Sequence, residues 1–160
     1  IKKIKNKKKI FVYGNGGSYS DSTHFVAELV SNYKNIKRKP LPILMLSSNI
    51  ASMTAWANDY QYETFLIREL KAISERGDVL ILVSTSGGNT KKKQSINLIK
   101  VAEYAKKNSI DVILFSGNRG GELKKYSKLN FITNSNNTPI IQENQKMIFH
   151  LISEIMDNVF

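Results

Sequence analysis

The sequence contains no cysteine among its 160 residues. Disulfide bonds, thiol nucleophiles and cysteine-ligated zinc are therefore excluded. No apolar run approaches the roughly 20 residues that a membrane-spanning helix needs. The Lys-rich N-terminus is not followed by the apolar stretch of a secretory signal. We therefore expect a cytoplasmic protein with no membrane partner.

Acidic residues are scarce, since 13 Asp and Glu stand against 24 Lys and Arg and leave a formal net charge of +11. Such an excess can mark a nucleic-acid-binding surface. The lysines, however, gather in short clusters such as 7–9 and 91–93, with a single Trp in the whole chain. Solvated surface lysine is thus favoured, and we expect no nucleic-acid partner. Attraction of an anionic small substrate is a second interpretation of the charge.

Apolar runs of strand length alternate with segments of helical period along the chain. We predict strands over 8–14, 42–46, 78–83, 111–115 and 129–133, and helices over 21–32, 51–57, 62–73, 94–107 and 139–159. The central strands are unbroken apolar runs, which is typical of parallel strands buried on both faces. The sequence therefore predicts one α/β domain over residues 1–160, with a parallel sheet between helix layers.

Two turns rich in small residues, 14–18 and 84–90, follow the first and third of these strands. Both fall at the carboxyl edge of the sheet, where ligands bind in such folds. The second turn offers hydroxyls and amides to a phosphate, and we expect the next helix to aim its positive end there. An ordinary capped loop is an equally good interpretation. The first turn is not a dinucleotide fingerprint, because Tyr19 stands where the third glycine is needed, so a small-ligand loop or a tight structural turn remains.

The chain has two histidines, His24 and His150. His24 and Glu28 are spaced i, i+4 and share one helix face. Gln142 lies eight residues before His150, a little over two turns, so these two also share a face. Together the four side chains would offer nitrogen and oxygen ligands to Zn²⁺ or a similar divalent ion. A surface contact for the first pair and a core or interface role for His150 stay open, because spacing does not show that the two helices meet.

Further motifs follow these in order along the chain. They are Ala57-Asn58-Asp59-Tyr60, Gly77-Asp78-Val79-Leu80, Ser84-Thr85-Ser86-Gly87, Thr138-Pro139 and Ile141-Gln142-Glu143. With the glycine-rich turn, His24, Glu28 and His150, the set resembles the sugar isomerase (SIS) domain of phosphoheptose isomerases. The resemblance spans residues 8 to about 157. It implies a three-layer α/β/α sandwich, Rossmann-like, and an enzyme that interconverts sedoheptulose 7-phosphate and D-glycero-D-manno-heptose 7-phosphate for lipopolysaccharide or capsule.

The resemblance also implies roles for single residues. It implies a Zn²⁺ or similar metal site at His24, Glu28, Gln142 and His150. It implies substrate contacts at Asn15, Gly16, Gly17, Asn58, Asp59, Ser84, Thr85, Ser86 and Gln142. We add the turn residues Ser18 and Thr90 to this set. For a cis-enediol mechanism, Glu28 is the candidate base and His150 the acid/base on the other side of the sugar. Glu28 would then be both ligand and base. The family's homotetramer, with active sites between subunits, is expected here too.

Three features depart from the family pattern. Few residues precede the first strand, so we expect the chain to lack the family's N-terminal helical segment. An extra Gly88 lengthens the phosphate turn, where Asn89 or Thr90 takes the place of the family's last serine. Ile140 stands where the family has Arg. A non-catalytic SIS protein that binds sugar phosphates or proteins is the alternative, but such scaffolds lose the catalytic Glu and the last His, and both are present here.

Overall fold

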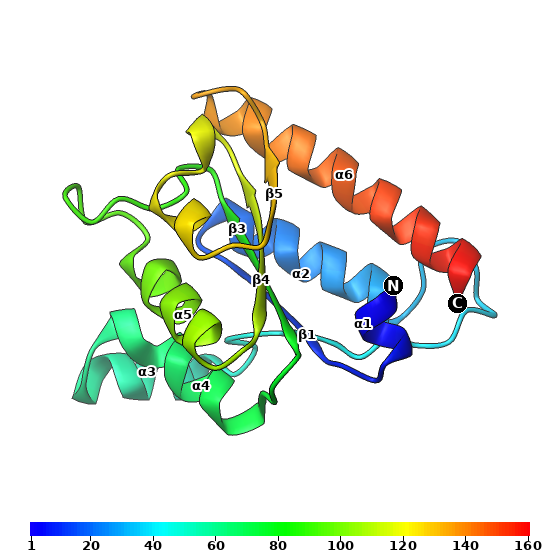
Figure 1. Cartoon of the computed structure of the whole chain (residues 1–160), viewed down its shortest axis with the longest axis horizontal. Coiled ribbons are helices and arrows are strands. Elements are labelled where there is room, and N and C mark those ends of the chain that lie inside the picture. The colour runs from blue at the N-terminus through cyan, green and yellow to red at the C-terminus, as the bar shows by residue number, and fades with distance from the viewer.

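A five-stranded parallel sheet forms the centre of the computed structural model, which describes residues 1–160 apart from the side chain of Asn118 (Figure 1). The strands are β1 Ile10–Gly14, β2 Ile43–Met45, β3 Val79–Ser84, β4 Asp111–Ser116 and β5 Leu129–Ile132. Their order across the sheet is β2-β1-β3-β4-β5, and each neighbouring pair is parallel. The prediction of a parallel α/β sheet is confirmed.

Helices cover both faces of the sheet. They are α1 Lys2–Lys5, α2 Gly17–Val30, α3 Ile50–Asp59, α4 Phe65–Ile73, α5 Ile96–Lys107 and α6 Thr138–Val159, with short 3₁₀ turns η1 Tyr62–Thr64, η2 Asn118–Gly120 and η3 Glu122–Lys125. Figure 1 shows α2 and α6 on one side of the sheet and α3, α4 and α5 on the other. In the part of the chain that the structure describes, no helix is both long and apolar enough to cross a membrane.

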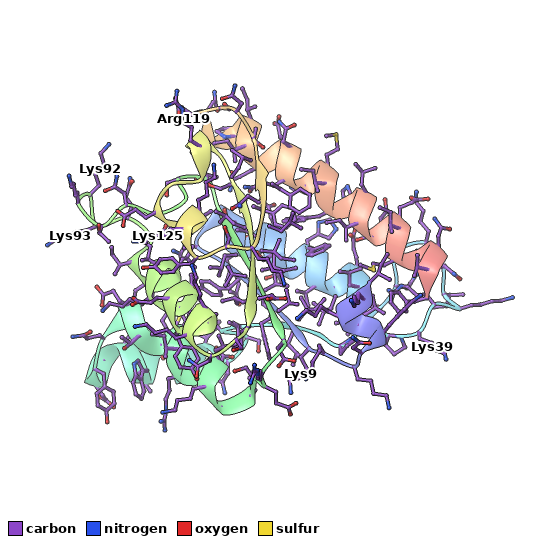
Figure 2. All side chains as sticks on the ribbon, viewed as in Figure 1. Lys9, Lys39, Lys92, Lys93, Arg119 and Lys125 are labelled. Carbon is purple, nitrogen blue, oxygen red and sulfur yellow. The ribbon has the colours of Figure 1, made fainter. Side chains whose placement is uncertain are left out.

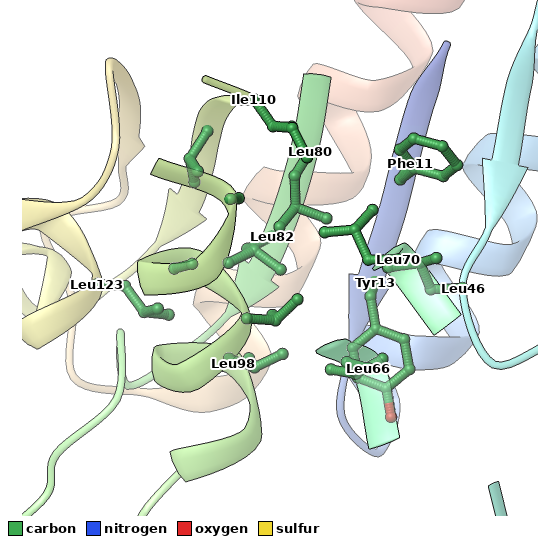
Figure 3. Close-up of a cluster of buried hydrophobic side chains, with 14 of the residues drawn as sticks. Phe11, Tyr13, Leu46, Leu66, Leu70, Leu80, Leu82, Leu98, Ile110 and Leu123 are labelled. Carbon is green, nitrogen blue, oxygen red and sulfur yellow. The ribbon is translucent and has the colours of Figure 1, made fainter. Parts of the chain in front are cut away.

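The core consists of two apolar clusters, one on each face of the sheet. The first joins β1 and β3 to α4 and α5 through side chains such as Leu66, Leu82 and Leu98 (Figure 3). The second joins the opposite face to α2 and α6, where Phe25 and Phe149 stack at a ring distance of 4.5 Å. Every residue of β1 and β3 is buried, so apolar side chains fill these strands up to their last residues, Gly14 and Ser84, which explains the apolar runs.

Several helix boundaries differ from the prediction. Helix α2 begins at Gly17 instead of 21, so the glycine-rich turn already contains its first two residues. Helix α5 begins at Ile96, because Lys93 and Ser95 have positive φ angles of 53° and the chain before them forms an antiparallel bridge. The Ser/Thr turn is therefore not followed directly by a helix. The predicted helix 62–73 divides into η1 and α4. Helix α1, η2 and η3 were not predicted, since pieces this short carry no clear apolar period.

A buried ion pair joins the ends of α2 and α6. Asp157 accepts hydrogen bonds from Arg38 Nε at 2.6 Å and from two backbone N–H groups, at 34–35. The Arg38 guanidinium also donates to the backbone carbonyls of Glu28 and Leu29, both at 2.8 Å. Arg38 has no exposed side-chain surface and Asp157 has 6%. The loop between α2 and β2 is thereby fixed against the last turns of α6.

The chain's single tryptophan, Trp56, lies on the opposite side of the sheet. Its indole N–H donates to the Thr64 hydroxyl at 2.9 Å, and its ring lies 4.3 Å from that of Tyr60. The Arg68 guanidinium lies 5.3 Å from the indole ring centroid. Trp56 packs against the α4–α5 cluster, so it fastens α3, which has no fully buried residue, to η1 and α4.

Candidate active site

The glycine-rich turn and the Ser/Thr turn lie at the same edge of the sheet. Strands β1 and β3 are parallel neighbours, with Gly14 paired to Val83. The two turns therefore leave the sheet side by side at its carboxyl edge, as predicted. This edge also receives the start of α2, which the glycine-rich turn leads into.

Three predicted residues converge from α2 and α6. Glu28 Oε1 lies 3.2 Å from His24 Nε2 and 3.5 Å from His150 Nε2. One ligand atom from each residue lies within 4.8 Å of the others. Glu28 is largely buried, with 12% of its side chain exposed, whereas His24 and His150 keep 53% and 40%. The site thus pairs a shielded carboxylate with two imidazoles that solvent reaches.

Ser153 orients the Glu28 carboxylate. Its hydroxyl donates to Glu28 Oε2 at 2.8 Å, and Ser153 is fully buried. One carboxylate oxygen therefore accepts the hydrogen bond from Ser153, while the other faces the two imidazoles. Tyr33 stacks on the His150 ring at 5.9 Å and further restricts it. Sequence reasoning missed Ser153, although its i+3 spacing from His150 places it on the same helix face.

The two donor separations measured from Glu28 suit a tetrahedral metal ion. Ligands at about 2.0–2.1 Å from Zn²⁺ lie about 3.3–3.4 Å apart around a tetrahedron. The observed separations of 3.2 and 3.5 Å on either side of Glu28 Oε1 bracket that value. Imidazole and carboxylate groups are ligands that Zn²⁺ accepts, and the serine holds the carboxylate as an outer-shell partner does. His24, Glu28 and His150 could therefore hold such an ion.

Gln142, the fourth predicted ligand, lies against the glycine-rich turn. A Cβ atom at Gly17 would be only 2.4 Å from Gln142 Nε2, so the amide needs a glycine at this position. Among the described residues, no hydrogen bond joins Gln142 to His24, Glu28 or His150. Its role as a ligand stays a prediction.

A cavity of about 370 Å³ opens beside the Ser/Thr turn. Its lining residues are Thr85, Ser86, Lys92, Gln94, Asn136, Thr138 and Ile141. Of the four predicted hydroxyls of this turn, Thr85 and Ser86 line the cavity, whereas Ser84 and Thr90 do not. Ser84 is buried, and its Oγ accepts the Gly87 N–H at 3.1 Å, so it supports the turn instead.

The start of α6, not of α5, meets this cavity, which corrects the expectation from the sequence. Thr138 is the first residue of α6 and lines the cavity. The Asn137 side chain makes no capping hydrogen bond with the described residues, and the first turn holds no acidic side chain. Backbone N–H groups and the positive end of a 22-residue helix therefore remain available to an anion.

Asn15 is tied to the first turn of α5. Its amide nitrogen donates to Asn97 Oδ1 at 3.0 Å, and its amide oxygen accepts from Asn97 Nδ2 at 2.9 Å. Asn15 also lines a second cavity, of about 390 Å³, together with Ser95 at the start of α5. Ser18 is buried in α2, and its carbonyl accepts the Ser22 hydroxyl at 2.7 Å.

Three predicted substrate contacts do not line the cavity beside the Ser/Thr turn. Asn58 and Asp59 are exposed at the end of α3, across the sheet from α2 and α6, with Asn58 Nδ2 donating to Asp59 Oδ1 at 2.9 Å. Thr90 uses both its N–H and its hydroxyl on Glu122 Oε1, at 2.6 and 2.8 Å. Ile140 is 45% exposed on the first turn of α6.

Two groups beside the glycine-rich turn have perturbed acidity. Burial raises the pKa of the Tyr13 phenol, and the adjacent Tyr62 hydroxyl raises it further. Burial also raises the pKa of Glu69. The Ser47 N–H donates a hydrogen bond to this carboxylate at 2.6 Å, which lowers the pKa and offsets part of the rise. Tyr13 and Tyr62 line a third cavity, of about 280 Å³. The raised pKa keeps the Tyr13 phenol protonated there at neutral pH.

Comparisons with known proteins agree with these features. Residues 1–117 match the family model of the SIS domain. The phosphoheptose isomerase of Helicobacter pylori (strain Shi470) is 39% identical over 160 residues, covering 100% of this chain and 80% of that protein. The probable phosphoheptose isomerase of Thermoplasma acidophilum is 39% identical over 157 residues, covering 98% and 82%. The structure of a phosphoheptose isomerase from Francisella tularensis has a TM-score of 0.88 at 29% identity and covers 98% of this chain and 82% of that one.

Proposed function

This chain belongs to the SIS-domain family of phosphoheptose isomerases, and from that premise we propose that it interconverts sedoheptulose 7-phosphate and D-glycero-D-manno-heptose 7-phosphate. The observation that carries the proposal is the meeting of His24, Glu28 and His150, from two helices. A binding protein without turnover has no need of a carboxylate held between two imidazoles. The site has the groups that a ketose–aldose isomerase requires.

The reaction moves a proton between C1 and C2 and shifts the carbonyl group. Glu28 removes the carbon-bound proton, giving a cis-enediol, and returns it to the neighbouring carbon. His150 exchanges the proton of the oxygen atoms on the other side of the sugar. Ser153 keeps the carboxylate in one orientation, so that little reorganisation precedes proton transfer.

His24, Glu28 and His150 would hold the divalent ion, with Gln142 as the proposed fourth ligand. When bound, Zn²⁺ or a similar ion supplies Lewis-acid polarisation of the carbonyl group. Thr85, Ser86 and the start of α6 bind the phosphate, which lies far from the reacting carbons. Its binding energy helps to fix the reacting end of the sugar.

The remaining features of the proposal concern assembly and context. We propose a homotetramer in which neighbouring subunits complete each site, because Asn58 and Asp59 lie across the sheet from the triad. An apolar stripe on α6 supports an interface. Its exposed members are Met147, Leu151 and Ile155, at 56%, 57% and 50%. We also propose a single SIS domain over 1–160, a cytoplasmic location and a place in lipopolysaccharide or capsule heptose synthesis.

Turnover of sedoheptulose 7-phosphate, followed by NMR with and without added Zn²⁺, tests the proposal. The wild-type protein is expected to form the aldose. Glu28→Gln nearly keeps the shape but removes the base, so kcat should fall about 10²-fold or more, while KM changes less. If the wild-type protein shows no turnover with any divalent ion, the isomerase assignment is wrong and the non-catalytic alternative takes its place. Wild-type kcat in Glu28→Gln would contradict the role of Glu28 alone.

A further inference from the structure

A structured loop carries three consecutive lysines beside the phosphate cavity. This lysine loop, residues 87–95, closes through an antiparallel pair in which Asn89 and Gln94 exchange backbone hydrogen bonds of 3.0 and 2.9 Å. The Lys92 N–H donates to Asn89 Oδ1 at 2.9 Å. The tip of the loop therefore has a defined hairpin conformation, and Figure 2 shows Lys92 and Lys93 projecting from it.

The base of the lysine loop is anchored to η3. Glu122 accepts both hydrogen bonds of Thr90, and its own backbone N–H donates to the Gly88 carbonyl at 3.2 Å. The Leu123 N–H donates to the Gly87 carbonyl at 2.9 Å. These bonds set the position of the lysine loop relative to the Ser/Thr turn that precedes it.

The three lysines have different surroundings. Lys92 lines the same cavity as Thr85, Ser86 and Thr138. Lys93 lines the neighbouring cavity beside Asn15, whereas Lys91 is absent from the described lining of both. No acidic residue is among the described residues around the first cavity, so an ammonium group there has no carboxylate to pair with.

We propose that Lys92 is a further substrate-binding residue, whose ammonium group binds the phosphate of the sugar phosphate in this cavity. The inference rests on the proposed isomerase function, which requires a phosphorylated sugar. Thr85, Ser86 and the uncapped start of α6 supply neutral donors, and Lys92 carries the full positive charge among the described lining residues. A lysine on a hairpin suits this role, because a compact charge on a flexible stem follows a tetrahedral phosphate without a fixed geometry. The lysine loop thereby becomes part of substrate recognition.

The matched pair Lys92→Ala and Lys91→Ala tests the proposal. Both remove one charge from the same exposed hairpin, but only the first removes a group that lines the cavity. The dissociation constant of inorganic phosphate, from NMR titration, should rise about tenfold in Lys92→Ala, the scale of one charge-assisted hydrogen bond. It should rise less than about twofold in Lys91→Ala, by the loss of long-range attraction alone. Lys92→Arg should restore most of the affinity.

Kinetics with sedoheptulose 7-phosphate separate this inference from the proposed function. Lys92→Ala should raise KM about tenfold with little change in kcat, because phosphate binding is the same in ground and transition states. Equal phosphate affinity in the two alanine variants would overturn the role of Lys92, and active wild-type enzyme would leave the isomerase assignment standing. If the wild-type protein is inactive but the variants show the expected phosphate affinities, the isomerase assignment is wrong and Lys92 remains a phosphate ligand.

Discussion

Replacing Asp157 by asparagine is expected to destabilise the protein strongly, although Asp157 lies outside the active site. The asparagine keeps the shape but loses the charge opposite Arg38, whose side chain has no exposed surface. The substitution also places an amide group among donors from Lys34, Asn35 and Arg38. An uncompensated buried charge typically costs about 3–5 kcal/mol in the free energy of unfolding.

This loss is large enough to measure easily. For a chain of this size, each kcal/mol lowers Tm by about 2–4 °C, so Tm should fall by roughly 6–20 °C. Urea unfolding at pH 7, followed by far-UV circular dichroism, gives the free energy directly. Glu154→Gln is the matched control, since it removes the exposed Lys34–Glu154 pair one turn earlier and should cost less than about 0.5 kcal/mol.

The pH dependence of the same variant adds a second check. Burial raises the pKa of Asp157, but the N–H groups of Lys34, Arg38 and Asn35 outweigh it and hold that pKa below its usual range. A carboxyl group with a lowered pKa stabilises the fold above its unfolded pKa of about 3.9, and this contribution is lost as the pH falls through the folded pKa. The difference between wild type and Asp157→Asn should be constant above about pH 5 and shrink below about pH 4. A difference under about 1 kcal/mol at pH 7, or one that does not shrink in acid, would refute the reasoning.

Two further predictions concern the candidate metal site. Ser153→Ala frees the Glu28 carboxylate and should weaken Zn²⁺ binding about tenfold in a chelator-competition titration, as outer-shell changes typically do; unchanged Zn²⁺ affinity would mean that Ser153 merely fills space. Gly17→Ala puts a methyl group 2.4 Å from Gln142 Nε2 and must displace that amide. It should also weaken Zn²⁺ binding about tenfold, and an unchanged affinity would remove Gln142 from the proposed ligand set.

Most of the sheet could be predicted from the sequence, because burial on both faces requires apolar residues at successive positions of a strand. Each residue of β1 and β3 is buried, so an apolar run marks each strand. The pairing of His24 with Glu28 was equally accessible, because one helix fixes their spacing. The partnership of Glu28 with His150 was not, since it depends on how α2 packs on α6, and 122 positions separate the two residues.

The surroundings of the phosphate cavity were harder to predict for a similar reason. A Ser/Thr turn before an amphipathic segment normally indicates a helix start, yet here a hairpin with positive φ angles intervenes. The helix whose start lines the phosphate cavity is α6, which is the last helix of the sequence. Ser153 illustrates the same limit, because a serine on a helix reveals its acceptor only when the opposite helix is in place.

Trp56 and the two histidines give the molecule two independent spectroscopic reporters, one on each side of the sheet. Trp56 is the only tryptophan and lies on the α3–α4 side of the sheet, so its fluorescence reports on that side alone. Both histidines of the chain belong to the triad, so their imidazole NMR signals report on the other side. A ligand that shifts the imidazole signals but leaves the emission unchanged acts locally. One that also changes the emission acts on the α3 side as well, and no engineered label is needed to tell the two apart.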